Sequence, residues 1–124
     1  MKTETPTKTK EILDHQLCAY SRSDVNEILK DFTEESELLT SYGGLKGLNK
    51  IRSYFEETFK MIPKGSSFEI VQMIVRENVA YVAWTCESPF ISIPLASDSF
   101  IIENDKIKFQ TVAVRIILQE GLDL

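Results

Sequence analysis

The spacing of apolar residues divides the chain into a helical first part and a stranded second part. Apolar residues recur at helical spacing over 12–20, 25–32 and 48–59, which predicts three amphipathic helices. Asp24 followed by Glu27 is typical of a capping pair at the start of the second helix. From residue 68 onward the period becomes two, which predicts strands over 68–76 and 79–87 and a final hairpin from Asp98 to about Leu118.

The segments between these elements carry turn signals. Residues 37–42 are expected to form a short strand, and Gly43, Gly44 and Gly47 to flank a loop. Pro89 and Pro94 are expected in a loop before the final hairpin. Helices followed by a long antiparallel meander predict a single α+β domain with helices on one sheet face. We expect a disordered or frayed N-terminus over 1–9, the domain over 10–118 and a C-terminal tail over 119–124.

The final hairpin places a carboxylate among apolar neighbours. Its turn signals lie at residues 103–106. The register that pairs Ile102 with Ile107 also places Phe100 opposite Phe109 and Asp98 opposite Thr111, all on one face. This face has the composition of a core. Ionisation of Asp98 is therefore expected to be costly unless its carboxylate is hydrogen-bonded.

Two interpretations of Asp98 follow from that position. In the first, an apolar cavity raises the pKa of the Asp98 carboxyl, which then donates a hydrogen bond or transfers a proton. In the second, Thr111 and backbone amides hold the carboxylate, which only fixes the sheet. The sequence leaves both open.

The hairpin over 68–87 has two apolar faces. A turn at Glu77–Asn78 sets a register in which one face carries Val75–Ala80, Met73–Val82 and Val71–Trp84, and this face should meet the helices. The opposite face carries Ile70, Gln72, Ile74, Tyr81, Ala83 and Thr85. It is more apolar than a sheet face that only contacts solvent.

Composition and charge limit the class of protein. The chain has 124 residues, of which 43% are hydrophobic and 27% charged, as in a globular domain. A net charge of −5 argues against broad nucleic-acid binding and against docking on anionic membranes. We therefore expect no nucleic-acid or membrane partner. The N-terminal residues have no apolar signal region and no apolar run is long enough to span a membrane, so we expect a cytoplasmic protein.

No metal site or cofactor is predicted. Cys18 and Cys86 are too widely spaced for a disulfide framework and have no accompanying ligand pattern, so both are expected to be buried free thiols. His15 is the only histidine and cannot form a paired metal site. Because polar residues flank it, we expect His15 to face solvent.

Four segments carry a resemblance to a known family: residues 24–33, 47–55, 80–84 and 98–107. Together, and in the expected order, they resemble the nuclear transport factor 2-like (NTF2-like) superfamily, and within it the SnoaL-like group of small bacterial proteins. The resemblance implies a cystatin-like roll, in which a cone-shaped, curved antiparallel sheet packs on the N-terminal helices around an apolar cavity. It also implies a homodimer formed through the outer sheet face. Members include ketosteroid isomerases, polyketide cyclases, dehydratases, epoxide hydrolases and non-catalytic modules, so the fold does not give the function.

The isomerase site carries over only in part. The resemblance places the family's helix-1 tyrosine at Gln16 and its aspartate base at Thr40, and both positions depart from the pattern. The second aspartate, a protonated oxyanion donor, falls on Asp98. Without a carboxylate at position 40, ketosteroid isomerase activity is not expected.

Two functions of different classes remain. In the first, a homodimer binds a small, largely hydrophobic molecule; if it is an enzyme, we expect lyase, isomerase or hydrolase chemistry with Asp98 as the catalytic group. The predicted pocket residues are then Gln16, Tyr20, Tyr42, Trp84 and Thr111. In the second, the cone is filled by its own side chains, aromatic ones included, and the protein is a non-catalytic dimerisation or partner-binding module. A cavity well below the usual ~300 Å³ of ligand pockets would favour the module.

Overall fold

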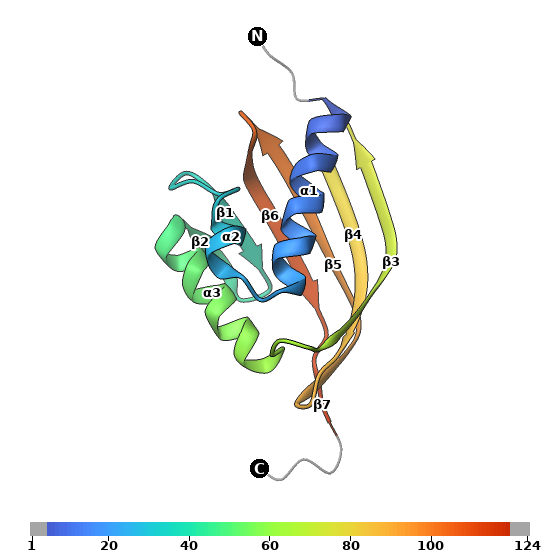
Figure 1. The fold of residues 1–124 in the computed structure, drawn as a ribbon. Coiled ribbons are helices and arrows are strands. Elements are labelled where there is room, and N and C mark those ends of the chain that lie inside the picture. Colours follow the sequence, from blue (N-terminus) through green and yellow to red (C-terminus); the bar gives the residue numbers. More distant parts are fainter. Residues whose placement is uncertain (1–4, 120–124) are drawn as a thin grey trace.

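Three helices pack on one face of a curved sheet in the computed structural model, which describes residues 5–119 (Figure 1). The helices are α1 (Pro6–Ser21), α2 (Val25–Leu29) and α3 (Leu48–Met61). The strands are β1 (Glu37–Thr40), β2 (Gly43–Lys46), β3 (Ser67–Arg76), β4 (Val79–Glu87), β5 (Ile91–Glu103), β6 (Lys106–Val114) and β7 (Ile117–Leu118). The predicted α+β class, with N-terminal helices on a curved sheet, is confirmed.

Helix α1 begins earlier than the sequence predicts. Pro6 occupies the first turn, and the side chain of Thr5 caps the helix by accepting a hydrogen bond from the Lys8 backbone amide. Thr9 is fully buried, and its hydroxyl donates to the Glu77 carbonyl oxygen at 2.7 Å. The prediction of a frayed segment is therefore wrong for residues 6–9. Residues 1–4 and 120–124 lie outside the described part of the chain.

The second helix begins where its capping pair predicts. The Asp24 carboxylate accepts a hydrogen bond from the Glu27 backbone amide at 3.1 Å, which fixes the first turn of α2. Helix α3 extends through Met61 and lies beside β1 and β2 (Figure 1). Its apolar side buries Ile51 and Phe55. Together α1 and α3 supply the helical wall of the core.

The sheet is mixed rather than a pure meander. Within residues 5–119 its strand order is β2-β1-β6-β5-β4-β3, with β7 paired to β5. Strands β3 to β6 form the predicted antiparallel meander, but β1 pairs with β6 in parallel. Residues 43–46, predicted as a loop, form a strand that pairs with β1, and Pro94, also predicted in a loop, lies inside β5. These two loop predictions are wrong.

A bulge in β3 changes one predicted pairing. Met73 pairs with Val82 and Val75 with Ala80, as predicted. The register then shifts between Ile70 and Gln72, so Ile70 rather than Val71 lies opposite Trp84. The shift turns Ile70 toward the interior and leaves Val71 exposed.

A second bulge changes the final hairpin. Ile102 pairs with Ile107, as predicted, and Asn104 and Asp105 adopt the positive φ values of a tight turn. The register shifts between Ile101 and Ile102, so Asp98 lies opposite Val112 and not Thr111. Because the side-chain period is two, this shift of one residue places Gln110 on the interior face in place of Thr111. The predicted pairing of Phe100 with Phe109 is wrong for the same reason, and Phe100 lies opposite Gln110.

Candidate functional site

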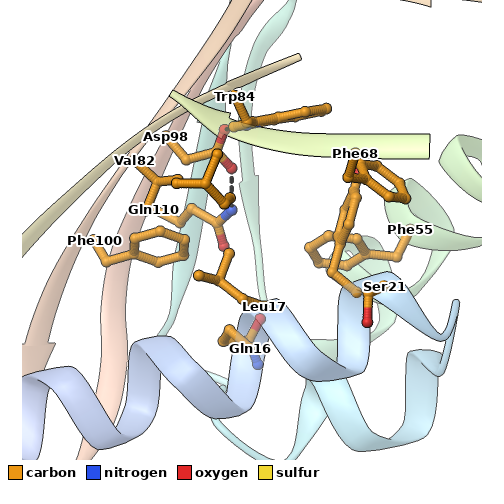
Figure 2. A pocket seen from close by; sticks show the side chains of 12 residues that line it. Gln16, Leu17, Ser21, Phe55, Phe68, Val82, Trp84, Asp98, Phe100 and Gln110 are labelled. Carbon is orange, nitrogen blue, oxygen red and sulfur yellow. Dashed lines mark hydrogen bonds between the residues drawn. The ribbon is translucent and has the colours of Figure 1, made fainter. Parts of the chain in front are cut away.

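The Asp98 carboxylate is held by two side chains from the neighbouring strands. The indole Nε1–H of Trp84 on β4 donates to one carboxylate oxygen at 2.9 Å. The amide Nε2–H of Gln110 on β6 donates to the other oxygen at 2.8 Å (Figure 2). Three adjacent strands therefore aim three polar groups at one point of the interior face. Both carboxylate oxygens act as acceptors.

A cavity of two adjoining lobes surrounds this carboxylate. The first lobe has a volume of about 190 Å³ and lies between α1 and strands β3 to β6. The second lobe has a volume of about 130 Å³ and extends toward α3, the β1–β2 turn and Ile116. Both lobes are lined by Tyr20, Phe55, Trp84, Asp98 and Gln110. The carboxylate thus lies where the two lobes meet, within mostly apolar walls.

Burial changes the acidity of Asp98. Removal of the carboxyl from water raises its pKa to about 6, and the hydrogen bonds from Trp84 and Gln110 act in the opposite direction. Asp98 keeps some accessible surface because it lines the cavity. A carboxyl with this pKa is largely ionised at pH 7 and changes charge in mildly acidic solution.

The Gln110 amide leaves one polar atom without a partner. Gln110 is buried, and its Oε1 is the one buried side-chain oxygen or nitrogen within residues 5–119 that accepts or donates no hydrogen bond. Figure 2 shows this oxygen pointing toward Leu17 of α1. A buried acceptor without a donor destabilises the fold by roughly 1–3 kcal/mol. Since less than 1 Å² of this oxygen is accessible to water, a donor could reach it only if the neighbouring side chains shifted.

Two tyrosines on the helices complete the polar lining. Tyr20 packs edge-on against Trp84 and Phe68, with ring centroids 5.9 and 5.6 Å apart. Tyr54 lines the second lobe. Burial and the nearby Asp98 charge raise the pKa of both phenols, that of Tyr20 well above its usual range. Both hydroxyls are therefore neutral at pH 7.

The structure brings four of the six predicted site residues together. Asp98, Trp84, Tyr20 and Gln16 all line the first lobe. Thr111 does not, because the bulge before Ile102 turns it outward, where it is exposed. The predicted role of Thr111 in holding Asp98 is wrong, and Gln110 has that role.

Tyr42 and Gln16 have positions that differ from the rest of the lining. Tyr42 lies in the β1–β2 turn at the rim of the second lobe, and its side chain is fully exposed. Gln16 is buried, but its amide nitrogen donates to the Ile28 carbonyl oxygen at 2.7 Å and to an Asp31 carboxylate oxygen at 2.8 Å. Gln16 thus attaches α1 to α2 as well as lining the cavity.

His15 also connects α1 to the α2 region. Contrary to the prediction, its side chain is not freely exposed to solvent. Its imidazole is half-buried between the carboxylates of Glu27 and Asp31, with the Glu27 oxygen at 2.9 Å. Hydrogen bonds that the imidazole donates to the Glu27 and Asp31 carboxylates raise the pKa of His15. His15, Glu27 and Asp31 thus hold α1 against α2, and none of the three lines either lobe.

Gln110, Tyr54 and Phe68 are lining residues that the sequence interpretation did not select. Gln110 immediately precedes Thr111 in the sequence. Only the correct register of the hairpin would have placed Gln110, rather than Thr111, on the interior face. Tyr54 and Phe68 belong to predicted elements, but aromatic residues at such spacings are usually core. Only the tertiary arrangement shows that they border a cavity.

The described residues contain no group of three or more histidine, cysteine, aspartate or glutamate side chains that could hold a metal ion. Cys86 is buried, and burial raises the pKa of its thiol to about 11, whereas Cys18 is exposed, contrary to the prediction. In the part of the chain that the structure describes, no helix is both long and apolar enough to cross a membrane.

No protein-family model matches this sequence, and no curated protein matches it. Solved structures do match it in three dimensions. A SnoaL-like protein of unknown function from Burkholderia thailandensis superposes with a TM-score of 0.73 at 16% identity, over 92% of this chain and 99% of that one. An NTF2-like protein of unknown function from Cytophaga hutchinsonii superposes with a TM-score of 0.69 at 17% identity, over 93% and 95%. This chain has the SnoaL-like, NTF2-like fold.

Similarity at this level describes the SnoaL-like fold and not an activity. A de novo designed protein with a curved β-sheet superposes equally well, with a TM-score of 0.75 at 14% identity over 88% of this chain and 86% of that one. A backbone of this kind therefore forms without any natural activity. The function has to be argued from the side chains around Asp98.

Proposed function

We propose that this SnoaL-like protein binds a small, largely apolar molecule in the two-lobed cavity, with Asp98 as the polar contact. The observation that supports the proposal is the single carboxylate at the junction of two apolar lobes, held by Trp84 and Gln110. A purely structural carboxylate has no need of empty apolar space on both sides.

The volumes limit the size of the molecule. An apolar protein cavity of about 150 Å³ is known to bind benzene. The first lobe, at about 190 Å³, is slightly larger. Each lobe alone is below the usual ~300 Å³ of a ligand pocket, and a ligand that occupies both would approach that size. The proposed ligand therefore has one or two rings or an aliphatic skeleton of similar volume.

Any chemistry in the cavity would proceed through Asp98. Among the described residues that line the two lobes, it is the group whose pKa lies near neutral pH. Proton transfer to or from a bound molecule is the reaction that a carboxyl of this kind performs, as in lyases, isomerases and some hydrolases. No carboxylate stands at position 40 to act as a second base. We therefore propose ligand binding as the function. Any catalysis would be proton transfer by Asp98 alone.

Trp84 provides a direct test, because it is the only tryptophan of the chain and lines both lobes. Titration with a neutral naphthalene derivative is expected to change the Trp84 fluorescence and to saturate. The matched variants are Ile70→Phe and Ile74→Phe on β3. Ile70 lines the first lobe and is 45% exposed, whereas Ile74 is 37% exposed and lines neither lobe. Ile70→Phe narrows the lobe and is expected to weaken binding at least tenfold, about 1.4 kcal/mol.

Ile74→Phe is the control for the added ring and is expected to bind as wild type does. Equal affinity of the two variants and the wild-type protein would contradict binding in the first lobe. Native mass spectrometry of freshly purified protein adds an independent measurement, since a retained molecule would appear as a discrete mass increase. The proposal predicts that Ile70→Phe retains less of it than Ile74→Phe.

The outer sheet face supports a homodimer, which is the second part of the proposal. Ile74 and Tyr81 lie directly opposite each other on β3 and β4, and each is 37% exposed. Val79 and Val71 extend this apolar surface. Monomeric proteins rarely leave a large contiguous apolar patch exposed to water. This face is also the candidate surface for the non-catalytic function, in which partner binding alone would be the role.

Ile74→Lys is expected to convert the dimer to a monomer, because the ammonium would be desolvated in the interface. Size-exclusion chromatography with light scattering would report a mass near twice 14.2 kDa for wild type and 14.2 kDa for the variant. Phe90→Lys, at an exposed phenylalanine of the β4–β5 connection, is the matched control and should leave the mass unchanged. A monomeric wild-type protein at micromolar concentration would refute the dimer. The cytoplasmic location remains a prediction from the sequence.

A further inference from the structure

The charge of the cavity lining has one sign. Among residues 5–119, Asp98 is the one acidic residue that lines the two lobes, and no lysine, arginine or histidine lines either of them. The carboxylate receives two N–H donors, but both are neutral groups. Its negative charge therefore has no positive counterpart within the described lining. Burying an ionised group without such a counterpart is unfavourable, and a cation in the cavity would remove much of that cost.

The other titratable groups that face this region leave the charge of Asp98 uncompensated. They are Tyr20 from α1, Tyr54 from α3, Cys86 from β4 and, at the exposed rim of the second lobe, Tyr42. Burial raises the pKa of the first three, that of Cys86 to about 11, so each of these is neutral at pH 7. Between about pH 6 and pH 8, Asp98 therefore determines the charge of the cavity.

The hydrogen-bonding pattern also favours a ligand that donates. Both Asp98 oxygens already accept N–H groups, which is the arrangement of a carboxylate rather than of a carboxylic acid with a proton to give. The Gln110 Oε1 beside it is a further acceptor without a donor. An ammonium group has up to three N–H donors and no acceptor, so it matches this set. A ligand carbonyl or carboxylate would add one more acceptor to a place that already has an excess.

Aromatic side chains form much of the first lobe. They are Tyr20 and the four rings labelled in Figure 2, which are Phe55, Phe68, Trp84 and Phe100. Their π-electrons attract cations, most strongly at tryptophan, and the attraction increases where water is excluded. The same rings also bury apolar carbon favourably. A molecule with both a cationic end and an apolar skeleton uses both properties.

We propose that the ligand of this cavity is a small organic cation, a protonated amine on an apolar skeleton, whose ammonium pairs with the Asp98 carboxylate. This inference rests on the proposed binding function and specifies its ligand class. The skeleton occupies the aromatic first lobe. The overall charge of −5 is compatible with attraction of a cation toward the protein.

Three probes of nearly equal size test the ligand class: 2-phenylethylamine, 2-phenylethanol and 3-phenylpropionate. Calorimetry and Trp84 fluorescence at about pH 7.5 should show the amine binding at least tenfold more tightly than the alcohol, and the carboxylate binding most weakly. Lowering the pH to about 5 protonates Asp98 while the amine stays charged. The affinity for the amine should then fall roughly tenfold, while that for the alcohol stays within about twofold.

Two variants separate the local charge from the net charge. Asp98→Asn should remove the preference for the amine, whereas Glu69→Gln, at an exposed carboxylate on β3, should keep it. Thermal unfolding verifies that both variants fold. An alcohol that binds as tightly as the amine, or a preference that survives Asp98→Asn, would overturn the cation inference and leave the binding function standing. Failure of all three probes to bind at millimolar concentration would count against both.

Discussion

Replacing Asp98 with asparagine is expected to stabilise the protein at pH 8 and to have little effect near pH 4. The pKa of the Asp98 carboxyl is about 6 in the folded protein and 3.8 as its ordinary value. The folded state holds this proton more tightly than the unfolded state does. The contribution of Asp98 to the free energy of unfolding is therefore most favourable below pH 3.8, and it is lost as the pH rises through 6. The shift corresponds to roughly 3 kcal/mol at pH 8, from 1.36 kcal/mol per pKa unit.

Asparagine can keep the local hydrogen bonds. Its carbonyl oxygen can accept from Trp84 Nε1, and rotation of the Gln110 amide by 180° lets Gln110 Oε1 accept from the asparagine nitrogen. Urea unfolding of both proteins between pH 4 and pH 8 measures the difference in free energy of unfolding. Glu69→Gln controls for loss of one exposed negative charge and should change stability by less than about 0.5 kcal/mol. Destabilisation by Asp98→Asn of equal size at every pH would identify the carboxylate as a structural anchor.

Replacing Phe55 with alanine is expected to destabilise the protein by about 3–5 kcal/mol, the usual range for a buried phenylalanine. Phe55 is 2% exposed and its ring lies against those of Tyr20, Phe32, Tyr54 and Phe59. It also lines both lobes, so its removal would enlarge the cavity. Urea unfolding at pH 7 measures the loss.

Phe90→Ala is the matched control for this substitution. Phe90 is 42% exposed, and we expect a cost below about 1 kcal/mol. A small apolar ligand such as benzene should recover part of the stability lost in Phe55→Ala, because it binds only the folded state. Equal costs for the two substitutions, or no recovery with benzene, would show that Phe55 is not a buried wall of a hollow cavity.

Local signals in the sequence predict the start of α2 and the turn of the final hairpin. The capping pair of α2 and the turn at residues 103–106 rely on contacts within a few residues, and the structure confirms both. The pairing of Ile102 with Ile107 follows from that turn alone. The burial of Asp98 could be predicted because its strand alternates in character and its face is otherwise apolar.

The hydrogen-bond partners of Asp98 could not be predicted, because the alternation of apolar and polar residues does not indicate where a β-bulge lies. Ile101 and Ile102 are both apolar, so a register shift between them exposes no obvious mismatch. That single shift exchanges Thr111 for Gln110 at the site. In the same way, the bulge after Ile70 places Ile70 rather than Val71 opposite Trp84. The sequence therefore identified Asp98 correctly and named Thr111 wrongly as its partner.

Pairing between distant segments was also beyond the sequence. The parallel contact of β1 with β6 joins residues 37–39 to residues 109–111 and involves no local turn. Strand β2 contains Gly43 and Gly44, which favour loops in isolation, and it forms because β1 provides a partner. The rim position of Tyr42 follows from this small hairpin.

The most direct test of an enclosed, ionisable carboxyl is its titration by carbon-13 NMR. The Asp98 carboxyl resonance can be assigned by comparing labelled wild-type protein with Asp98→Asn. We expect its midpoint at about pH 6, in the absence of added ligand. A midpoint at or below 3.8, the ordinary value for aspartate, would mean that the carboxyl is solvated or fully compensated, and would contradict the account.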